Sequence, residues 1–504
     1  MNLAANLGAR ARLARDKDLT LGTLLERLAA VHGERRLVAE LGCDPLTLTY
    51  TEAATLVSRW SDAVARRTTP GDRVVVALPN SYRLFLACAA VARAGAVPVP
   101  VNDRMRPDEV DHVITDSGAD VVLRTAADLA GGVGGAGAVR AEPSDVAALF
   151  YTSGTTGKPK GARLTNRALV GQLGSGALWP GRLRRDEAVI ALPIAHIMGF
   201  SALAGLAVAG IPVCSLPRFS APAVLDAIEA RRATMFIGVP TMYRMLLEAG
   251  AEERDLRSIR VFASGADVMP PELARRFQRM GATLTVPGTD RSIGEALFVE
   301  GYGMVEVGGA VATRLSPSFL PTLLGDALGM TLPGYKTRVV DDAGRDVRRG
   351  QVGELWVQGP GVLDGYHNNP EASAETVTPD GWLRTGDLAR RGPLGLLVFA
   401  GRQKDVIKNG GYSVFAVEVE ASLQDHPDVL EAAVIGLPDE RSGEVPVAVV
   451  RLRPGASTTA DELVAWAAGA MAAYKAPRRI IVVDDLPRTG TTKVHKDELR
   501  PLFT

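Results

Sequence analysis

Residues 145–161 read DVAALFYTSGTTGKPKG, in which an apolar run leads directly into glycines, hydroxyl residues and two lysines. The apolar run, residues 145–151, has the length and composition of a buried strand. In residues 151–161 the small side chains leave backbone N–H groups accessible, the hydroxyls add donors, and Lys158 and Lys160 supply positive charge. A loop of this kind after a strand can wrap a polyphosphate, because amide dipoles and cations both favour negative charge.

This loop differs from a Walker A phosphate loop. That motif needs a glycine five residues before its Gly-Lys pair and a serine or threonine after it, whereas Thr152 and Pro159 occupy these two positions here. The residues that we expect to contact phosphate are Thr152, Ser153, Gly154, Thr155, Thr156, Gly157, Lys158 and Lys160.

The overall composition is that of a neutral globular protein. The chain has 504 residues, with 57 basic and 57 acidic side chains, so its formal net charge is zero. Without net charge it creates no global field that recruits nucleic acid or anionic membrane, so any polyanion must be held locally. The length predicts three or four structural units, and the 53 glycines and 31 prolines stay below the fraction typical of low-complexity sequence.

Scarce residue types give further expectations. Of the 57 basic side chains only nine are lysines. Cys43, Cys88 and Cys214 are isolated, which is typical of a reducing, cytoplasmic location and predicts no metal site built from cysteines.

Residues 1–16 lack the continuous apolar segment of a secretory signal. Residues 188–217 contain no charged side chain, but prolines and glycines interrupt them, so we expect a strand, a helix and a second strand rather than a membrane span.

The N-terminal half alternates strand-like and helix-like segments. The apolar runs 72–78 and 96–101 flank residues 82–93, which have apolar side chains at helical spacing. This alternation predicts parallel α/β layers. A Gly/Ala stretch, residues 131–138, is typical of a flexible surface loop. Further strands are expected at residues 188–193, 233–239 and 260–263, with a helix beginning at Pro240.

The pattern of predicted secondary structure changes twice in the C-terminal half. After Gly334 come short strands with turns, at 336–340 and 353–357, which suggest an antiparallel or barrel-like unit. From about Gly401 onward the pattern is that of a small α+β domain of roughly 100 residues. Its expected elements are residues 417–426, 432–435, 445–452, 461–471 and 480–483.

With these motifs in place, the chain is similar to a known family. Residues 151–161 resemble the phosphate loop of the AMP-forming acyl/aryl-CoA synthetases, a family of adenylate-forming enzymes, and the resemblance extends from about residue 48 to the end. Further segments are similar to the family's motifs and follow its order: LPIAH (192–196, acyl-pocket gate), SGAD (264–267) and GYGMVE (301–306) (adenine and metal), GWLRTGD (381–387, ribose), GRQKDVIKNGGYSV (401–414, hinge) and LPRTGTTKV (486–494, catalytic lysine).

The resemblance implies an α/β fold in two domains. Residues 1–400 would form an AMP-binding adenylation domain of layered α/β subdomains plus a β-barrel-like subdomain. Residues 401–504 would form a small mobile α+β lid that carries the hinge and the catalytic lysine.

It also implies a reaction in two steps. A carboxylic acid attacks Mg·ATP and releases pyrophosphate, and the thiol of coenzyme A then displaces AMP from the acyl adenylate to give a thioester. ATP, Mg²⁺ and coenzyme A are the implied cofactors, and the partners are small molecules, with no nucleic acid and no expectation for oligomeric state. Alternatives are an acyl-AMP ligase that loads a carrier protein, a malonyl- or aryl-CoA ligase, a nucleotide-binding pseudoenzyme and a luciferase-type oxygenase.

The motifs assign roles to individual residues. By resemblance the catalytic residues are Lys493, Lys408, Glu306 and His196, with Glu306 also holding the metal. The adenine- and ribose-binding residues are Ser264, Gly265, Ala266, Tyr302, Asp387 and Arg402, where the two oxygens of Asp387 suit paired ribose hydroxyls. Lys404 is the hinge pivot, and Gly410 and Gly411 line the coenzyme A tunnel. Five of the nine lysines fall in these motifs, which is too clustered for solvation alone.

The acyl pocket is predicted to be apolar and partly small. Its expected lining is Met198, Phe200, Phe236, Gly238, Val307, Gly308 and Gly309, which favours a medium- or long-chain fatty acid. The gate has Ala195 and His196 rather than a carboxylate, so an amino acid's ammonium would be left unpaired. Arg291 could clamp a second carboxylate, and residues 286–299 form either a pocket wall or a surface loop. Two positions depart from the family pattern, Val305 in place of threonine and Thr492 in place of glycine.

Overall fold

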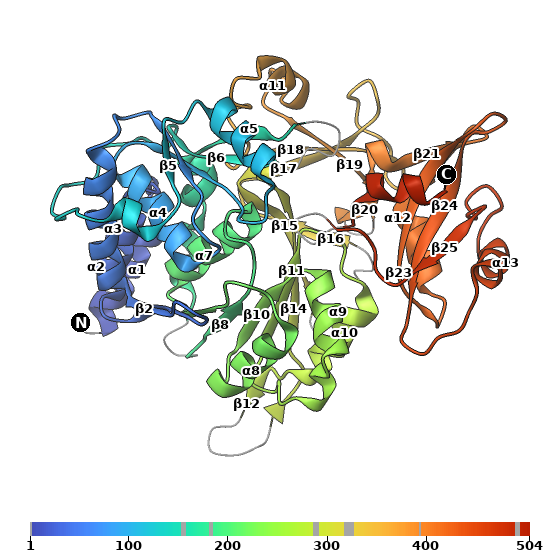
Figure 1. The fold of residues 1–504 in the computed structure, drawn as a ribbon, viewed down its shortest axis with the longest axis horizontal. Helices are drawn as coiled ribbons and strands as arrows, with labels where there is room; N and C mark the ends of the chain where they lie inside the picture. Colours follow the sequence, from blue (N-terminus) through green and yellow to red (C-terminus); the bar gives the residue numbers. More distant parts are fainter. Residues whose placement is uncertain are drawn as a thin grey trace. The chain divides into compact units, whose positions relative to one another are not determined.

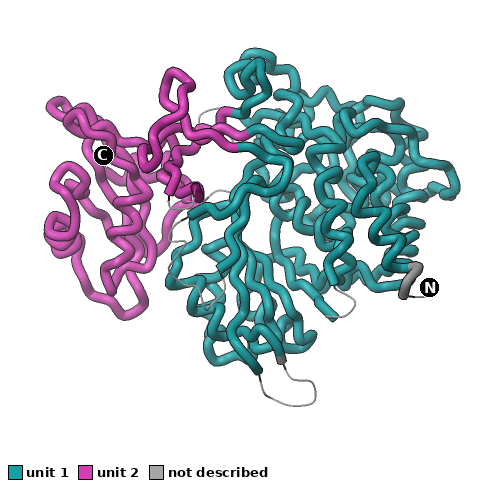
Figure 2. Tube along the Cα trace, turned by 180° about the vertical axis from the view of Figure 1, so that it is seen from behind, with its two compact units in different colours: residues 1–336, 358–383 teal, residues 337–357, 384–504 magenta. Residues whose placement is uncertain are grey.

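The computed structural model describes residues 3–152, 158–180, 185–285, 292–316, 327–392, 395–488 and 494–503. They form two compact units, of which unit 1 comprises residues 1–336 and 358–383 and unit 2 comprises residues 337–357 and 384–504 (Figure 2). The expected large α/β part and smaller C-terminal part are both present. The predicted division at residue 400 into an adenylation domain and a lid concerns catalysis, and it stays a prediction.

The main sheet of unit 1 is parallel at its centre. Its strand order is β16-β15-β14-β11-β10-β8-β9-β1-β2. The strands from β14 to β1 run parallel, and β15, β16 and β2 are each antiparallel to a neighbour. The bounds are β1 (Arg36–Glu40), β2 (Leu46–Thr49), β8 (Ala188–Ile190), β9 (Val213–Ser215), β10 (Met235–Gly238), β11 (Val261–Gly265), β14 (Leu297–Met304), β15 (Gly309–Ser316) and β16 (Ala327–Thr331).

The charge-free residues 188–217 form β8, helix α7 (Ile197–Ala209) and β9, which confirms the predicted strand, helix and strand. Most of α7 is buried, which explains why it has no polar face. No helix among the described residues has both the length and the apolar character that crossing a membrane requires.

Helices α8 (Ala221–Arg231), α9 (Pro240–Glu248) and α10 (Pro271–Met280) lie beside the strands of this sheet (Figure 1). One hydrophobic cluster with an aromatic centre packs them against it. Tyr243 of α9 and Phe277 of α10 are fully buried with ring centroids 4.8 Å apart, and both contact Phe262 of β11. Such edge-to-face pairs add about 0.5–1.5 kcal/mol beyond their buried area. Helix α9 begins at Pro240 as predicted, because proline is tolerated at the first helical position.

A second α/β layer of unit 1 lies nearer the N-terminus. Strand β3 pairs in parallel with β4 and β5, while β6 and β7 form an antiparallel pair. Helix α4 spans Tyr82–Arg93, the predicted range. The bounds of the other elements are α1 (Leu3–Ala14), α2 (Leu24–His32), α3 (Tyr50–Ala65), β3 (Arg73–Val76), β4 (Val97–Pro100), α5 (Pro107–Ser117), β5 (Val121–Leu123), η1 (Ala126–Leu129), β6 (Val146–Thr152), β7 (Lys160–Thr165), η2 (Arg167–Gly171), η3 (Leu173–Leu178), η4 (Ala251–Glu253), β12 (Leu284–Thr285), β13 (Ser292–Ile293), η5 (Val305–Val307) and α11 (Pro370–Thr376).

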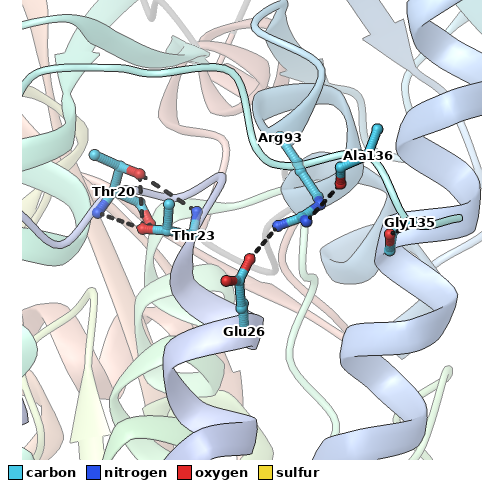
Figure 3. A network of polar contacts seen from close by, with 7 residues as sticks. Thr20, Thr23, Glu26, Arg93, Gly135 and Ala136 are labelled. Carbon is cyan, nitrogen blue, oxygen red and sulfur yellow. Dashed lines mark hydrogen bonds and ion pairs between the residues drawn. The ribbon is translucent and has the colours of Figure 1, made fainter.

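The Gly/Ala stretch 131–138 has no regular secondary structure, as predicted, but it is anchored rather than flexible. Arg93 of α4 is only 8% exposed, and its Nη2 donates to the carbonyl of Ala136 at 2.9 Å. Its Nη1 lies 2.7 Å from Oε2 of Glu26 on α2 (Figure 3). On α3, the carboxylate of Asp62 accepts a bond from the N–H of Gly134 at 2.6 Å. Two helices, α3 and α4, therefore hold this loop through side-chain contacts, and Glu26 of α2 holds the Arg93 side chain that makes one of them.

Unit 2 contains two sheets. One has the order β17-β18-β19-β20, and the other has the order β22-β21-β24-β23, with β25 parallel to β24. The predicted short strands and the predicted C-terminal α+β elements are thus present, while a barrel-like arrangement of the short strands stays a prediction. The bounds are β17 (Lys336–Val340), β18 (Val352–Gln358), β19 (Leu383–Arg391), β20 (Leu397–Arg402), η7 (Gln403–Asp405), β21 (Val406–Asn409), β22 (Tyr412–Phe415), α12 (Ala416–Gln424), β23 (Val429–Asp439), β24 (Gly443–Leu452), α13 (Ala460–Ala470), β25 (Ile480–Val483) and η8 (Lys496–Phe503).

The C-terminal sheet of unit 2 is covered on both faces. On one face, Leu423 of α12 and Leu463 of α13 pack against alternate residues of β23 and β24. On the other face, Leu499 and Phe503 of η8 pack against Val447 of β24 and its neighbours. The strands read as continuous apolar runs because both faces are buried.

We expect Arg93→Met to destabilise unit 1 by about 1–3 kcal/mol, because it leaves the Ala136 carbonyl and Glu26 without their cation. The matched control is Arg140→Met, which removes an ion pair with Glu142 whose two side chains are 91% and 55% exposed, and should change stability by about 0.5 kcal/mol or less. Calorimetric unfolding checks this: equal Tm values for the two variants would contradict it.

Candidate active site

The predicted nucleotide segments meet at the carboxyl ends of neighbouring parallel strands in unit 1. The register places Gly238 of β10 beside Ser264 of β11, and Ser264 beside Glu300 of β14. One position further on, Gly265 pairs with Gly301. In open α/β sheets, ligands bind outside the carboxyl ends of the strands. The structure therefore brings together segments that lie about 25 to 60 residues apart in the sequence.

The end of β11 has two unusual features. The hydroxyl of Ser264 is buried and makes no hydrogen bond with any described residue. Ala266, just past the strand, has φ of 67°, a left-handed conformation that is rare for a residue with a Cβ. Strained backbone of this kind clusters at functional sites. Tyr302, predicted to contact adenine, lies half-buried in the adjacent strand β14.

The gate motif is held by a residue that the sequence did not single out. His196 is the N-cap of α7, and its Nδ1 accepts a bond from the N–H of Met198 at 3.2 Å. The amide of Asn80 accepts from the N–H of Ile194 at 2.7 Å and donates to the carbonyl of Pro217 at 2.8 Å. Asn80 thereby fixes the chain that leads into His196. Its only sequence signal was its place between a strand and a helix.

The predicted acyl-pocket residues differ in burial. Phe200 is fully buried, with ring centroids 5.0 Å from Phe85 and 5.3 Å from Phe150. Phe236 is fully buried against Tyr243, and the buried backbone of Gly238 lies close to the same ring. Each of these aromatic rings has core neighbours, so its role in an acyl pocket stays a prediction.

Gly308 and Gly309 of the predicted acyl pocket, and Gly265 of the predicted adenine segment, differ in the space around their backbone. A Cβ at Gly265 would lie 3.5 Å from the terminal methyl of Met198, and one at Gly309 would lie 3.4 Å from Ser201. Gly308, with φ of 63°, packs against the carbonyl of Ala168. Gly265 and Gly308 are buried by these contacts, whereas Gly309 and Met198 are partly exposed. Val307 is fully buried beside them.

Glu306 contacts a tyrosine that sequence reasoning missed. Glu306 lies in η5, and its Oε1 accepts a hydrogen bond from the hydroxyl of Tyr366 at 2.9 Å. The ammonium of Lys160 lies over the same tyrosine ring, 4.9 Å from its centroid. Burial, and then the nearby Glu306 charge, raise the pKa of Tyr366 above its usual value, so the phenol remains a donor. No motif connects position 366 with positions 160 and 306.

Helix α5 holds both sides of the predicted phosphate loop. Of the residues expected to contact phosphate, Ser153 to Gly157 lie outside the described residues, while Thr152, Lys158 and Lys160 are described. Asp116 accepts a bond from the hydroxyl of Tyr151 at 2.6 Å, before the loop. The Nε2 of His112 lies 2.9 Å from the carbonyl oxygen of Pro159, after the loop.

The predicted ribose pair comes together in unit 2. Asp387 of β19 and Arg402 of β20 are register partners, and Oδ1 lies 3.1 Å from Nε. The Asp387 side chain is 3% exposed and the Arg402 side chain 45%. The hydroxyl of Thr385 accepts the Asp387 N–H at 3.1 Å. A nearly buried carboxylate in the middle of a strand, oriented by its neighbours, is a suitable acceptor for paired hydroxyls.

The predicted hinge residues follow Arg402 directly in the sequence. Lys404 lies in η7, where burial lowers its pKa against the opposing effect of Asp405. Lys408 of β21 donates from Nζ to the hydroxyl of Ser413 at 2.9 Å. Gly410 and Gly411, with φ of 58° and 83°, form the two-residue turn between the paired strands β21 and β22. Positive φ at both positions is the requirement of the tightest hairpin turn, so these glycines also have a structural reason.

Two predicted features fall outside the described residues. Lys493 lies there with Thr492, but the flanking Arg488 and Val494 form a β-bridge, and Arg488 pairs with the buried Glu431 at 2.8 Å. Arg291 and residues 286–290 are also outside. Residues 292–293 form β13, which pairs with β12, so part of this segment is a hairpin.

Glu306 fits a magnesium ion shared with a nucleotide. The described residues contain no group of three or more His, Cys, Asp or Glu side chains that could enclose a metal ion. Mg²⁺ commonly binds through one or two carboxylates together with substrate phosphates, and needs no such cage. One oxygen of Glu306 accepts from Tyr366, which leaves the second oxygen available for the ion.

Comparisons with known proteins show the family of this chain. The model of the AMP-binding enzyme family matches residues 25–134 and 125–367, and that of the AMP-binding enzyme C-terminal domain matches residues 418–493. The chain belongs to the AMP-forming acyl/aryl-CoA synthetase family. As a member of this family it is an AMP-forming acid–thiol ligase that uses ATP to join a carboxylic acid to coenzyme A.

Relatives of this synthetase include enzymes named for hydroxycinnamates. It is 36% identical over 481 residues to feruloyl-CoA synthase of an Amycolatopsis species, covering 90% of this chain and 94% of that one. It is 31% identical over 477 residues to 4-coumarate–CoA ligase-like 6 of Oryza sativa subsp. japonica, covering 85% and 77%. Its fold matches the O-succinylbenzoate coenzyme A synthetase of Bacillus subtilis in complex with ATP and magnesium ion, with a TM-score of 0.80, 29% identity and coverage of 95% and 99%.

The synthetase should lose stability in acid partly through His367, whose N–H donates to the carbonyl of Gly161. Burial, with a smaller contribution from Arg73, lowers the pKa of the His367 ring below 6.5. Below pH 6.5 the unfolded chain therefore binds more protons at His367 than the folded chain does. The free energy of unfolding that His367 contributes is fully present above its unfolded-state pKa and is lost as pH falls through its folded-state pKa. We expect the drop in Tm between about pH 7.5 and about pH 5.5 to be smaller in His367→Gln than in the wild type. An identical drop would contradict this.

Proposed function

We propose that this synthetase activates an aryl-substituted carboxylic acid of the hydroxycinnamate type to its acyl adenylate and transfers the acyl group to coenzyme A. The observation that carries the substrate class is the 36% identity, over 90% of the chain, to a relative named for ferulate. At Gly309 a Cβ would meet only the Ser201 side chain, at 3.4 Å, so its backbone offers surface on which a planar ring packs more closely than on branched side chains. Met198, whose terminal methyl lies near Gly265, is flexible and its sulfur interacts favourably with aromatic rings.

In the adenylation step the acid attacks the α-phosphate of ATP and pyrophosphate leaves. Negative charge develops on the phosphoryl oxygens, so fixed cations lower the barrier. We assign this role to Lys493, with Lys158, Lys160 and residues 152–157 holding the phosphates. Glu306 would hold Mg²⁺, which supplies neutralising charge at the phosphates when bound.

The other motif residues complete the nucleotide site in this proposal. Ser264, Gly265, Ala266 and Tyr302 contact adenine, while Asp387 and Arg402 contact the ribose. The buried, unpaired hydroxyl of Ser264 and the left-handed backbone at Ala266 support a ligand at this strand end. His196 acts as the gate beside the reacting carboxylate, since its ring already caps the helix that carries Met198.

The thioester step uses the residues of the hinge region. Residues 401–504 act as the mobile lid, with Lys404 as pivot, and Lys408 with Gly410 and Gly411 guides the pantetheine arm. Movement of the lid between two positions would separate two incompatible events, because pyrophosphate must leave before the thiol enters. The open space around Gly410 and Gly411, where a Cβ would meet no atom within 4 Å, supports access for an extended chain.

A fatty acid is the second candidate substrate. The apolar character of Met198, Phe200 and Val307 favours it, although Phe200 is occupied by contacts with Phe85 and Phe150. Neither hydroxycinnamate-type relative is named for a fatty acid. The two candidates differ in shape, so a substrate panel separates them.

The decisive experiment measures AMP release and thioester formation with ATP, Mg²⁺ and coenzyme A. Ferulate, 4-coumarate and cinnamate are compared with hexanoate, decanoate and palmitate. We expect kcat/KM for a hydroxycinnamate to exceed that for each fatty acid by roughly tenfold or more, because a slot shaped for a ring loses contacts with a flexible chain. A higher kcat/KM for decanoate or palmitate would establish the fatty-acid alternative instead.

Further versions of this assay, with a carrier protein in place of coenzyme A or with detection of light, test the remaining alternatives. Thioester formation only when a phosphopantetheinylated carrier protein replaces coenzyme A would indicate an acyl-AMP ligase. Absence of AMP with every acid would indicate a pseudoenzyme, and light emission in air would indicate an oxygenase. An added malonate arm tests whether a second carboxylate is accepted.

We expect Lys493→Ala to abolish acid-dependent exchange of pyrophosphate into ATP while leaving thioester formation from supplied acyl adenylate intact. The reason is that its charge is needed only where phosphoryl charge develops. Isotope exchange and thioester assays on the same preparation measure the two steps. Equal loss of both steps would remove this assignment.

Gly411→Leu is the counterpart variant. It should retain the exchange reaction and lose thioester formation, because the leucine occupies the open side of the turn. Its backbone at φ of 83° makes the substitution strained, so circular dichroism must first show a folded protein. Loss of exchange in the folded variant would mean that Gly411 serves only the turn.

A further inference from the structure

Tyr366 stands between two groups of opposite charge. Its hydroxyl donates to Oε1 of Glu306 at 2.9 Å, while its ring faces the ammonium of Lys160 at 4.9 Å from the centroid. The tyrosine side chain is almost completely buried, at 7% exposure. One side chain therefore contacts both the proposed metal carboxylate and a proposed phosphate-binding lysine.

The backbone around Tyr366 is fixed on both sides. Tyr366 forms β-bridges with Ala162 of β7 and with Asn369, and its N–H donates to the hydroxyl of Ser373 at 2.8 Å. The next residue, His367, donates its N–H to the carbonyl of Gly161 at 2.7 Å. Lys160 and Tyr366 are therefore held by paired backbone segments, although 206 positions separate them in the sequence.

Glu306 is fixed through its own backbone as well. Its carbonyl accepts the N–H of Leu363 at 2.9 Å, three residues before Tyr366. The segment 363–367 thus reaches Glu306 with one main-chain bond and one side-chain bond, and reaches β7 with main-chain bonds. This is more anchoring than a surface connection between β18 and α11 requires.

The aromatic ring also acts as a spacer. Among the described residues Lys160 and Glu306 form no direct ion pair with each other. A direct pair would satisfy each charge internally and weaken the attraction of both for a metal–nucleotide complex. The tyrosine satisfies one carboxylate oxygen by a hydrogen bond and the ammonium by a cation–π contact, and keeps the two charges apart.

We propose that Tyr366 is a positioning residue that holds Glu306 ready for the metal and Lys160 ready for the nucleotide phosphates, while preventing the two from pairing. This inference rests on the function proposed above. Tyr366 itself touches neither acid nor nucleotide in this scheme; it acts through its two neighbours.

Two substitutions separate its two contacts. Tyr366→Phe removes the hydrogen bond to Glu306 and keeps the ring beneath Lys160, whereas Tyr366→Leu removes both. The matched control is Tyr243→Phe, which also deletes a buried tyrosine hydroxyl of unit 1, one that donates to the carbonyl of Ala263 at 2.8 Å within the aromatic core.

The measurement is calorimetric binding of ATP to each full-length variant, without carboxylic acid, in the presence and absence of Mg²⁺. In Tyr366→Phe we expect the gain in ATP affinity on adding Mg²⁺ to fall by roughly five- to tenfold, with the metal-free affinity unchanged. In Tyr366→Leu the metal-free affinity should fall as well, by roughly two- to fivefold, since Lys160 loses its support. Tyr243→Phe should lower Tm while leaving both affinities unchanged.

Several results would overturn the inference. A Tyr366→Phe variant that keeps the wild-type gain from Mg²⁺ would show that the hydrogen bond has no role in metal binding. If Tyr366→Phe lowered the affinity for ATP equally with and without Mg²⁺, Tyr366 would have only a structural role. If the inference holds, Tyr366→Phe should instead raise the KM for ATP in the AMP-release assay and leave kcat similar to that of the wild type. The proposed function fails separately, if the wild type binds ATP but releases no AMP with any acid.

Discussion

Backbone pairing between residues 364–367 and Gly161–Arg163 is the constraint on which the site in unit 1 depends. The N–H of Arg163 donates to Gly365, that of Asp364 donates to Arg163, and Arg163 also pairs with the Asp364 carboxylate. These backbone bonds join a segment near the C-terminal end of unit 1 to β7, the strand that follows the predicted phosphate loop. Without them, Tyr366 would have no fixed position, and Glu306 and Lys160 would lose their common neighbour. Main-chain bonds suit this task because they do not depend on side-chain rotamers.

Local patterns in the sequence were sufficient for most of the elements. Helix α4, strand β17 and strand β25 have the predicted bounds, because apolar periodicity directly reports the buried face of a helix or strand. The order of the motifs was sufficient for the family, whereas Asp387 and Arg402 were expected to share a ribose and their direct ion pair was not predicted. These are features whose information lies within a short stretch of chain or in a fixed order of stretches.

Contacts over long sequence separations could not be predicted in this way. Tyr366, Asn80 and His112 each act on segments far from their own position, and nothing in their local sequence reveals the partner. The same reason explains why residues 131–138 were expected to be flexible: glycine and alanine carry no sign of the Arg93 and Asp62 side chains that hold them. Phe200 was expected only as a pocket wall, because hydrophobicity alone does not tell which apolar residues pack into the core.

The way the two compact units interleave along the chain has a consequence for recombination between members of the family. Strand β20 ends at Arg402, whose guanidinium pairs with Asp387 on β19. A junction placed at residue 400 would cut through β20 and take Asp387 and Arg402 from different parents, leaving their ion pair to chance. Junctions at 336/337, 357/358 and 383/384 follow the borders of the units, separate only one terminal residue of β17, β18 or β19, and take Asp387 and Arg402 from one parent. Chimeric synthetases built on those borders would exchange unit 2 while Glu306, Tyr366 and Lys160 of unit 1 keep their neighbours within that unit.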